Sequence, residues 1–209
     1  IVGWAVDDAV ISPDNLVRLW FQKLADNVDT ELAGTTRTDY AGNLITKLYI
    51  QEDGTDLKQL IQKFLLGAVN YSQGTDDYLD NDIEDKGLLS DNISQDGESP
   101  YTSLEHQFDE GFGYFGAARD FNNYTDKDIN DADLIDTDED GAIDLKSEFN
   151  FGHSTNAAKR DLGASVATDF TKDAFDAFLA GRQIINGAAG DALSDEEAEV
   201  LYAQRDIAV

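Results

Sequence analysis

Residues 101–118 read YTSLEHQFDEGFGYFGAA, and this stretch decides the fold. At 100° per residue, its large apolar side chains fall on one stripe of an α-helix. The stripe comprises Leu104, Phe108, Gly111, Phe112 and Phe115. Thr102 and Glu105 have the spacing of a capping box, which predicts that the helix begins here. We therefore expect a buried helix at the centre of the molecule.

The opposite face of this helix carries a different chemistry. It comprises His106, Asp109, Glu110, Gly113 and Ala117. The two carboxylates follow the histidine by three and four positions, where side chains of one helix meet. This spacing favours a transition-metal site or an acid–base pair. The alternative is a hydrogen-bonded interior histidine, with the glycines allowing close helix–helix contact, and the residues alone leave both interpretations open.

Helical patterns recur on both sides of this stretch. Further helices are predicted from Pro13 (with Ser12 as N-cap), over residues 54–78, from Ser154 (as a cap) to Arg160, over residues 170–185, and from Ser194 (a second capping box with Glu197). No run of alternating strand residues separates them. The sequence predicts an all-α fold: a helical bundle of five to six helices with long Asp-rich loops. We expect one domain over residues 1–209, with an Asp-rich insertion at residues 120–151.

The charge balance excludes some classes of protein. The chain has 43 acidic and 15 basic residues and a net charge of −28, and 32 of the acids are Asp. Such a field repels phosphate backbones, so nucleic acid is not an expected partner. Asp is a poor helix former and a good ligand for hard cations, which favours cation-binding loops in a saline or extracellular setting.

Other classes are excluded by what the composition lacks. The chain has no cysteine and no run of about 18 apolar residues. The sequence therefore predicts no disulfide, no thiolate metal site and no membrane span. Because the chain starts at Ile1 and contains no Met, we expect it to be a processed or partial chain.

The most specific motif lies in the Asp-rich insertion, where residues 136–144 read DTDEDGAID. Acids stand at positions 1, 3, 5 and 9 of an EF-hand loop, with Gly141 at the turn position. Position 12 is Ser147 rather than Glu, and Glu148 follows one residue late. The predicted Ca²⁺ ligands are Asp136, Asp138, Asp140, the carbonyl of Ala142, Asp144 and Glu148. The alternative is a solvated acidic loop without an ion.

Three segments carry a family resemblance: residues 60–68 (LIQKFLLGA), 105–116 (EHQFDEGFGYFG) and 143–151 (IDLKSEFNF). Together they resemble a group of surface lipoproteins of marine Bacteroidetes that is related to the imelysin-like proteins. The resemblance spans about residues 54–185. It implies a helical bundle at the outer-membrane surface, in the periplasm or outside the cell, held to the membrane only by a lipid anchor that this chain lacks. It also implies an association with iron uptake.

The imelysin-like motif, Gly-x-His-x-x-Glu, is only partly matched. His106 stands at the histidine, Asp109 at the glutamate with Glu110 beside it, and Leu104 replaces the glycine.

Three hypotheses of function follow. The first is a non-enzymatic, calcium-stabilised envelope or extracellular protein for metal acquisition, with iron or another transition metal near His106, Asp109 and Glu110. The second is a structural or adhesive module of an extracellular assembly, for which the acidic surface and the calcium loop suffice. The third is a metallopeptidase with His106 as ligand and Glu110 as general base. Expected partners are metal ions and envelope or extracellular proteins, and the oligomeric state is not predicted.

Overall fold

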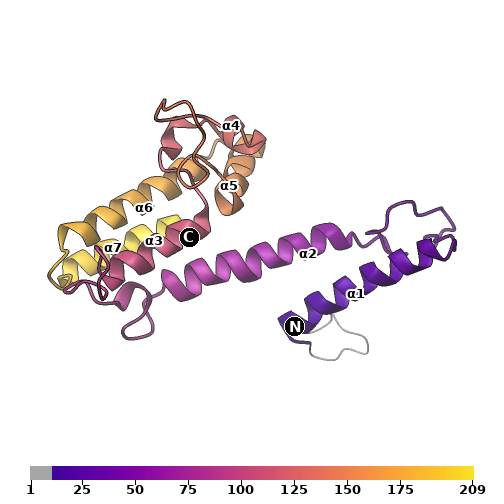
Figure 1. Ribbon diagram of the computed structural model, residues 1–209, viewed down its shortest axis with the longest axis horizontal. Helices are drawn as coiled ribbons and strands as arrows, with labels where there is room; N and C mark the ends of the chain where they lie inside the picture. Colours follow the sequence, from indigo (N-terminus) through magenta and orange to yellow (C-terminus); the bar gives the residue numbers. More distant parts are fainter. Residues whose placement is uncertain (1–10) are drawn as a thin grey trace. The chain divides into compact units, whose positions relative to one another are not determined.

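The structure is a computed structural model, and it describes residues 11–209 of the chain (Figure 1). Over this range the protein is all-α, with helices and isolated β-bridges but no strand, which confirms the predicted fold class. The α-helices are α1 (Pro13–Leu32), α2 (Leu57–Leu65), α3 (Ser103–Phe115), α4 (Asp126–Asp131), α5 (Gly152–Gly163), α6 (Phe170–Gly187) and α7 (Asp195–Ala208). None of these helices is long and apolar enough to cross a membrane.

The chain divides into two compact units, Ile1–Leu66 and Gly67–Val209. The sequence predicted one helical domain over residues 1–209, and the structure divides that range near the end of α2. The two units have separate apolar cores, one around Trp20 and the other around Phe108.

In the first unit, α1 and α2 pack against each other. Helix α1 begins as predicted, with Pro13 at the first position and the Ser12 hydroxyl accepting a hydrogen bond from the Asn15 amide. Helix α2 begins slightly later than expected, because Asp56 rather than Thr55 is its N-cap. The core of this unit comprises Leu16, Trp20, Leu57 and Ile61.

Helix α2 continues directly into π-helical turns, η2 (Leu66–Tyr71) and η3 (Gly74–Tyr78). This agrees with the predicted helical end near residue 78. In the second unit, η3 lies against α3: a Cβ on Gly74 would be 3.1 Å from Cβ of Tyr114, and the rings of Tyr78 and Tyr114 stack at 5.5 Å. Short 3₁₀ turns follow at η4 (Gly87–Leu89) and η5 (Phe121–Asn123).

The second unit is organised around α3, which packs against α5 and α6, while α6 packs against α7 (Figure 1). The predicted capping box of Thr102 and Glu105 starts α3, and its predicted apolar stripe is buried, with Phe112 partly exposed. Two glycines allow close packing: a Cβ on Gly111 would meet Leu79 at 2.6 Å, and a Cβ on Gly181 would meet Phe108 at 2.5 Å. Nothing lies within 4 Å of a Cβ on Gly113, so Gly113 takes no part in this packing.

Two helix starts differ from the prediction. Ser154 is not a cap: α5 begins at Gly152, and the buried Ser154 hydroxyl donates to the carbonyls of Gly116 and Phe151, both at 2.8 Å. Helix α4 was not predicted, although Thr125 and Asp128 form its capping box. Its sequence signal is weak, because Asp128 stands in place of the usual Glu or Gln at the third position of the box.

Candidate metal site

The Asp-rich insertion leaves α3 and returns to α5 at the same place, where its two ends are joined by hydrogen bonds. The Phe151 amide donates to the Gly116 carbonyl at 2.8 Å, and the Arg119 amide donates to the Ser147 carbonyl at 2.7 Å. The Ala118 amide donates to the buried side chain of Asn150 at 2.7 Å. Gly116 has a φ of +81° and ends α3, and a Cβ there would lie 2.4 Å from the Phe151 carbonyl oxygen. The insertion is therefore a loop with fixed ends.

Within the loop, backbone amides fold the acidic motif into a tight turn. Oδ2 of Asp136 accepts a hydrogen bond from the Gly141 amide at 2.8 Å, and Oδ1 accepts one from Asp140 at 3.2 Å. Oδ1 of Asp138 also accepts from the Asp140 amide at 3.2 Å. Gly141 has a φ of +89°, a left-handed conformation that explains the glycine at this position.

Glu148 closes the loop from the other side. Its side chain accepts hydrogen bonds from the amides of Thr137 (2.6 Å), Asp138 (3.3 Å) and Asp144 (2.8 Å), and from the Thr137 hydroxyl (2.9 Å). These bonds, led by that from the Asp144 amide, hold the pKa of Glu148 below its usual value. Only 3% of the residue is exposed. Glu148 is thus a buried carboxylate at a fixed position.

The three carboxylates converge. One side-chain oxygen from each of Asp136, Asp138 and Glu148 lies within 4.8 Å of the others. Within residues 11–209, none of the three forms an ion pair with a cationic side chain. The Asp140 amide lowers the pKa of Asp138, but desolvation and the charges of the neighbouring carboxylates outweigh that bond and raise it. An oxygen-only set of this kind suits a hard divalent cation.

The other predicted calcium ligands lie outside this group. Oδ1 of Asp140 accepts from the Ala142 amide at 2.8 Å. Asp144 accepts from the Lys146 amide at 2.9 Å and from the Ser147 hydroxyl at 3.1 Å, and these bonds hold its pKa low. Asp140, Ala142 and Asp144 are all exposed. The structure therefore brings together three of the six predicted ligands.

The polar face of α3 is arranged differently. Nε2 of His106 lies 4.0 Å from Oε1 of Glu110, and its ring stacks on Tyr101 with centroids 5.3 Å apart. Asp109 points to another partner, because its Oδ1 accepts from Nε of Arg182 at 2.8 Å. Over the described residues these three side chains do not form a group at metal-ligand distances. The transition-metal and peptidase hypotheses stay predictions.

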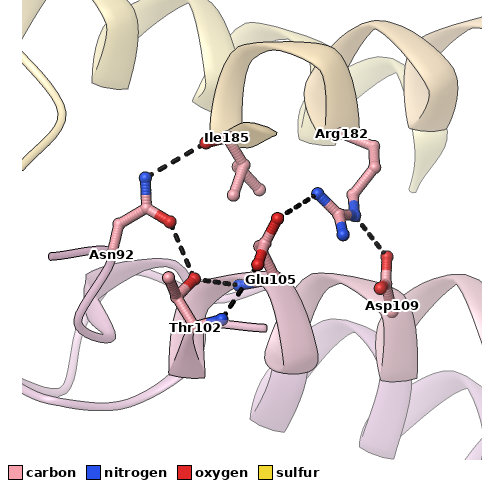
Figure 2. A network of polar contacts seen from close by, with 6 residues as sticks. All are labelled: Asn92, Thr102, Glu105, Asp109, Arg182 and Ile185. Atoms are coloured by element: carbon pink, nitrogen blue, oxygen red, sulfur yellow. Dashed lines mark hydrogen bonds and ion pairs between the residues drawn. The ribbon is translucent and has the colours of Figure 1, made fainter. Parts of the chain in front are cut away.

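Figure 2 shows that this face takes part in a structural network. Nη1 of Arg182 donates to Oε1 of Glu105 at 2.9 Å, while Oε2 of Glu105 accepts from the Thr102 amide at 2.9 Å. The Thr102 hydroxyl donates to Asn92 at 2.8 Å, and the Asn92 amide donates to the Ile185 carbonyl at 3.1 Å. The network joins the start of α3 to α6.

Glu105 is the buried centre of that network. Burial raises the pKa of Glu105, but the bonds from Thr102 and the Arg182 guanidinium outweigh burial, so that the pKa lies below its usual value. Arg182 is not among the site residues predicted from the sequence. It stands one turn from Phe178 and from Ile185, on the apolar stripe of α6. A cation on an apolar stripe predicts a buried acidic partner, and this signal was available in the sequence.

Fold and site together define an all-helical protein with an acidic candidate metal loop. The chain belongs to the family described as a domain of unknown function (DUF4856), whose model matches residues 6–201. No curated protein and no solved structure matches the chain. The resemblance to imelysin-like proteins stays a prediction.

Proposed function

We propose that the Asp136–Glu148 loop binds Ca²⁺ and that the ion has a structural, non-enzymatic role in a protein of the bacterial envelope or extracellular space. The observation that supports this proposal is the convergence of Asp136, Asp138 and Glu148 within 4.8 Å without a cationic side chain. Three like charges at this separation repel one another, and a bound cation removes the repulsion.

The surroundings favour calcium over a softer or smaller ion. The donors are carboxylates and carbonyls, with neither a histidine nor a cysteine among them, which suits a hard cation. Calcium takes six to eight oxygens in variable geometry. In the proposed bound state, Asp140, Asp144 and the carbonyl of Ala142 complete the coordination shell from the rim.

A structural role fits the way in which the loop is held. Its ends are joined at Gly116 and Phe151, and Glu148 is already placed by four hydrogen bonds. Residues 136–148 contain six acids and one lysine, a net charge of −5. Extracellular calcium modules work at dissociation constants of about 0.1–1 mM, which a partly preformed site can reach.

The proposal is tested by calorimetric titration with Ca²⁺ and by thermal unfolding, with protein first stripped by a chelator. Wild-type protein is expected to bind one Ca²⁺ more tightly than Mg²⁺, and the double variant Asp136→Asn/Asp138→Asn is expected to lose binding. Glu139→Gln is the matched control, because Glu139 lies in the same loop but outside the group. Equal calcium binding by the double variant and the control would overturn the proposal.

A further inference from the structure

The second unit, Gly67–Val209, also has an open groove beside α3 and α6. Its volume is about 510 Å³, within the range of small-molecule sites. Its apolar wall includes Phe112 and Phe175, which are half-buried with ring centroids 6.0 Å apart, and Leu179, which is 48% exposed. The two partly exposed rings are tilted by 59° against each other, and they offer an apolar, angled surface to another apolar group.

The charges around the groove are opposite in sign to those of the molecule. Ten residues line it, and they include three cations, Arg119, Lys146 and Arg182, and one carboxylate, Asp109. The whole chain has only 15 basic residues in 209, against 43 acidic ones. The three cations and one carboxylate of the lining thus carry a net charge of +2 on a strongly negative protein. This reversal of sign is an argument from charge complementarity for an anionic occupant.

Two of the three cations form no ion pair over the described residues, although the charge of Lys146 acts on the neighbouring Asp144. Arg182 is engaged with Glu105 and Asp109 (Figure 2). Arg119 and Lys146 are exposed, and over residues 11–209 neither forms an ion pair.

The backbone holds Arg119 and Lys146 on adjacent segments. The Arg119 amide is bonded to the Ser147 carbonyl at 2.7 Å, and the Lys146 amide is bonded to Asp144 at 2.9 Å. The cations are therefore set on fixed backbone rather than on a free loop.

We propose that this groove binds a small organic anion, with an aromatic or branched apolar body on Phe112, Phe175 and Leu179 and a carboxylate held by Arg119 and Lys146. Arg182 contributes long-range attraction, while its own bonds to Asp109 and Glu105 remain in place. The groove combines an apolar surface with a few polar groups at one end, which is the usual composition of a ligand site. Lys146 belongs to the Asp136–Glu148 loop and its amide is bonded to Asp144, so the groove adjoins the proposed calcium site, and the probe is titrated both in EDTA and in calcium.

The test uses naphthalene-2-carboxylate as probe and its neutral amide as the matched comparison, both followed by calorimetry on the full chain. The carboxylate is expected to bind at least about tenfold more tightly than the amide, a difference of about 1.4 kcal/mol. The double variant Arg119→Gln/Lys146→Gln is expected to lose that preference. Leu179→Glu, at an exposed position, is expected to weaken binding of the carboxylate by a similar factor through repulsion.

Lys159→Gln is the control, because Lys159 is an exposed cation on α5 outside the groove. It is expected to leave both affinities unchanged. Equal binding of carboxylate and amide would overturn the proposal, as would equal loss in the double variant and in Lys159→Gln. A self-associated protein that dissociates in the double variant and binds no probe would also overturn it, because the groove would then cover a second copy of the chain.

Discussion

Two regions of the second unit use carboxylates in opposite ways. On α3, Glu105 and Asp109 share one guanidinium, with Arg182 at 2.9 Å and 2.8 Å. In the loop, Asp136, Asp138 and Glu148 converge within 4.8 Å and receive only amide and hydroxyl hydrogen bonds. The first arrangement includes a cation supplied by the chain itself, and the second does not.

This difference bears on how acidic sites are recognised. The α3 face has the spacing expected of a metal site. However, Arg182 of α6, more than 70 positions further along the chain, donates hydrogen bonds to Asp109 and to Glu105. The loop has no such cation, so an ion from solution is the available counter-charge. If the comparison is right, removing Ca²⁺ should lower the stability of the loop but not of the α3 network. Replacing Arg182 should weaken the α3 network but leave the loop unchanged.

The largest expected effect is the calcium response and its loss in Glu148→Gln. By mass action, calcium at 100 times its dissociation constant adds about 2.7 kcal/mol of stability. For a unit of this size, that is a rise of roughly 5–10 °C in the melting temperature. Glu148→Gln removes one charge and places an NH₂ group against the Asp144 amide, so the rise should vanish.

Differential scanning calorimetry with and without EDTA measures this effect. Glu105→Gln is the matched control, because it is also a buried glutamate at a network centre but lies on α3. It should retain the full calcium response. A calcium response that survives in Glu148→Gln would show that this carboxylate is not a ligand.

The next effect is expected in Arg182→Met, which keeps the apolar stem and removes the charge. Glu105 then remains buried without its cation, at a cost of about 2 kcal/mol, or roughly 4–8 °C in melting temperature. Arg18→Met is the control, since Arg18 and Asp14 are also paired at 2.9 Å but are about 70% exposed, and such pairs contribute little. The calcium response should be unchanged in both variants. Equal melting temperatures for the two variants would mean that the α3 network adds nothing to stability.

The sequence predicted much of the fold and part of the sites, for physical reasons. Helix starts with a side-chain cap, such as Ser12, Thr102 and Ser194, could be placed because the signal is local. The start of α5 could not, because Phe151 offers no cap and the helix is positioned by bonds to Gly116.

In the sites, too, the sequence predicts contacts between residues that are close along the chain but not contacts between distant ones. The turn of the acidic loop follows from the spacing of Asp136, Asp138 and Gly141, which are close in sequence. The pairing of Asp109 with Arg182 spans 73 positions, and no spacing rule predicts it. The loop's closing residue, Glu148, was predicted because it lies near the position that the motif requires.

A smaller effect is expected in the pH dependence of stability. The pKa of Glu105 is lowered in the folded state, so its contribution is present above the unfolded value of about 4.3 and is lost as the pH falls through the folded pKa. Below about pH 4.3, the free energy of unfolding should therefore fall less steeply with decreasing pH in Glu105→Gln than in wild type. The difference in slope is at most about 1.4 kcal/mol per pH unit. Melting temperatures in EDTA between pH 6 and 3 measure the slope. Parallel curves for Glu105→Gln and wild type would show that the carboxylate is not specifically held.

The smallest effect is expected in Asp138→Asn, which should shift the melting temperature in opposite directions in EDTA and in calcium. Desolvation and the neighbouring carboxylates outweigh the Asp140 amide bond and raise the pKa of Asp138. The ionised form therefore destabilises the ion-free protein as the pH rises above the pKa of an unfolded Asp, about 3.9. In EDTA at pH 7, Asp138→Asn should therefore raise the melting temperature, by about 1–2 °C for a change at one exposed charge. With calcium present, the same variant should be the less stable one.

Asp109→Asn provides the contrast, because it weakens the pair with Arg182 whether or not calcium is present. It should lower the melting temperature in both conditions. The two aspartates differ neither in chemistry nor greatly in exposure, so opposite signs in EDTA can arise only from the charges around them. A fall in melting temperature for both variants would mean that the amide bonds to Asp138 outweigh the repulsion. The loop would then be stable without an ion, as α3 is.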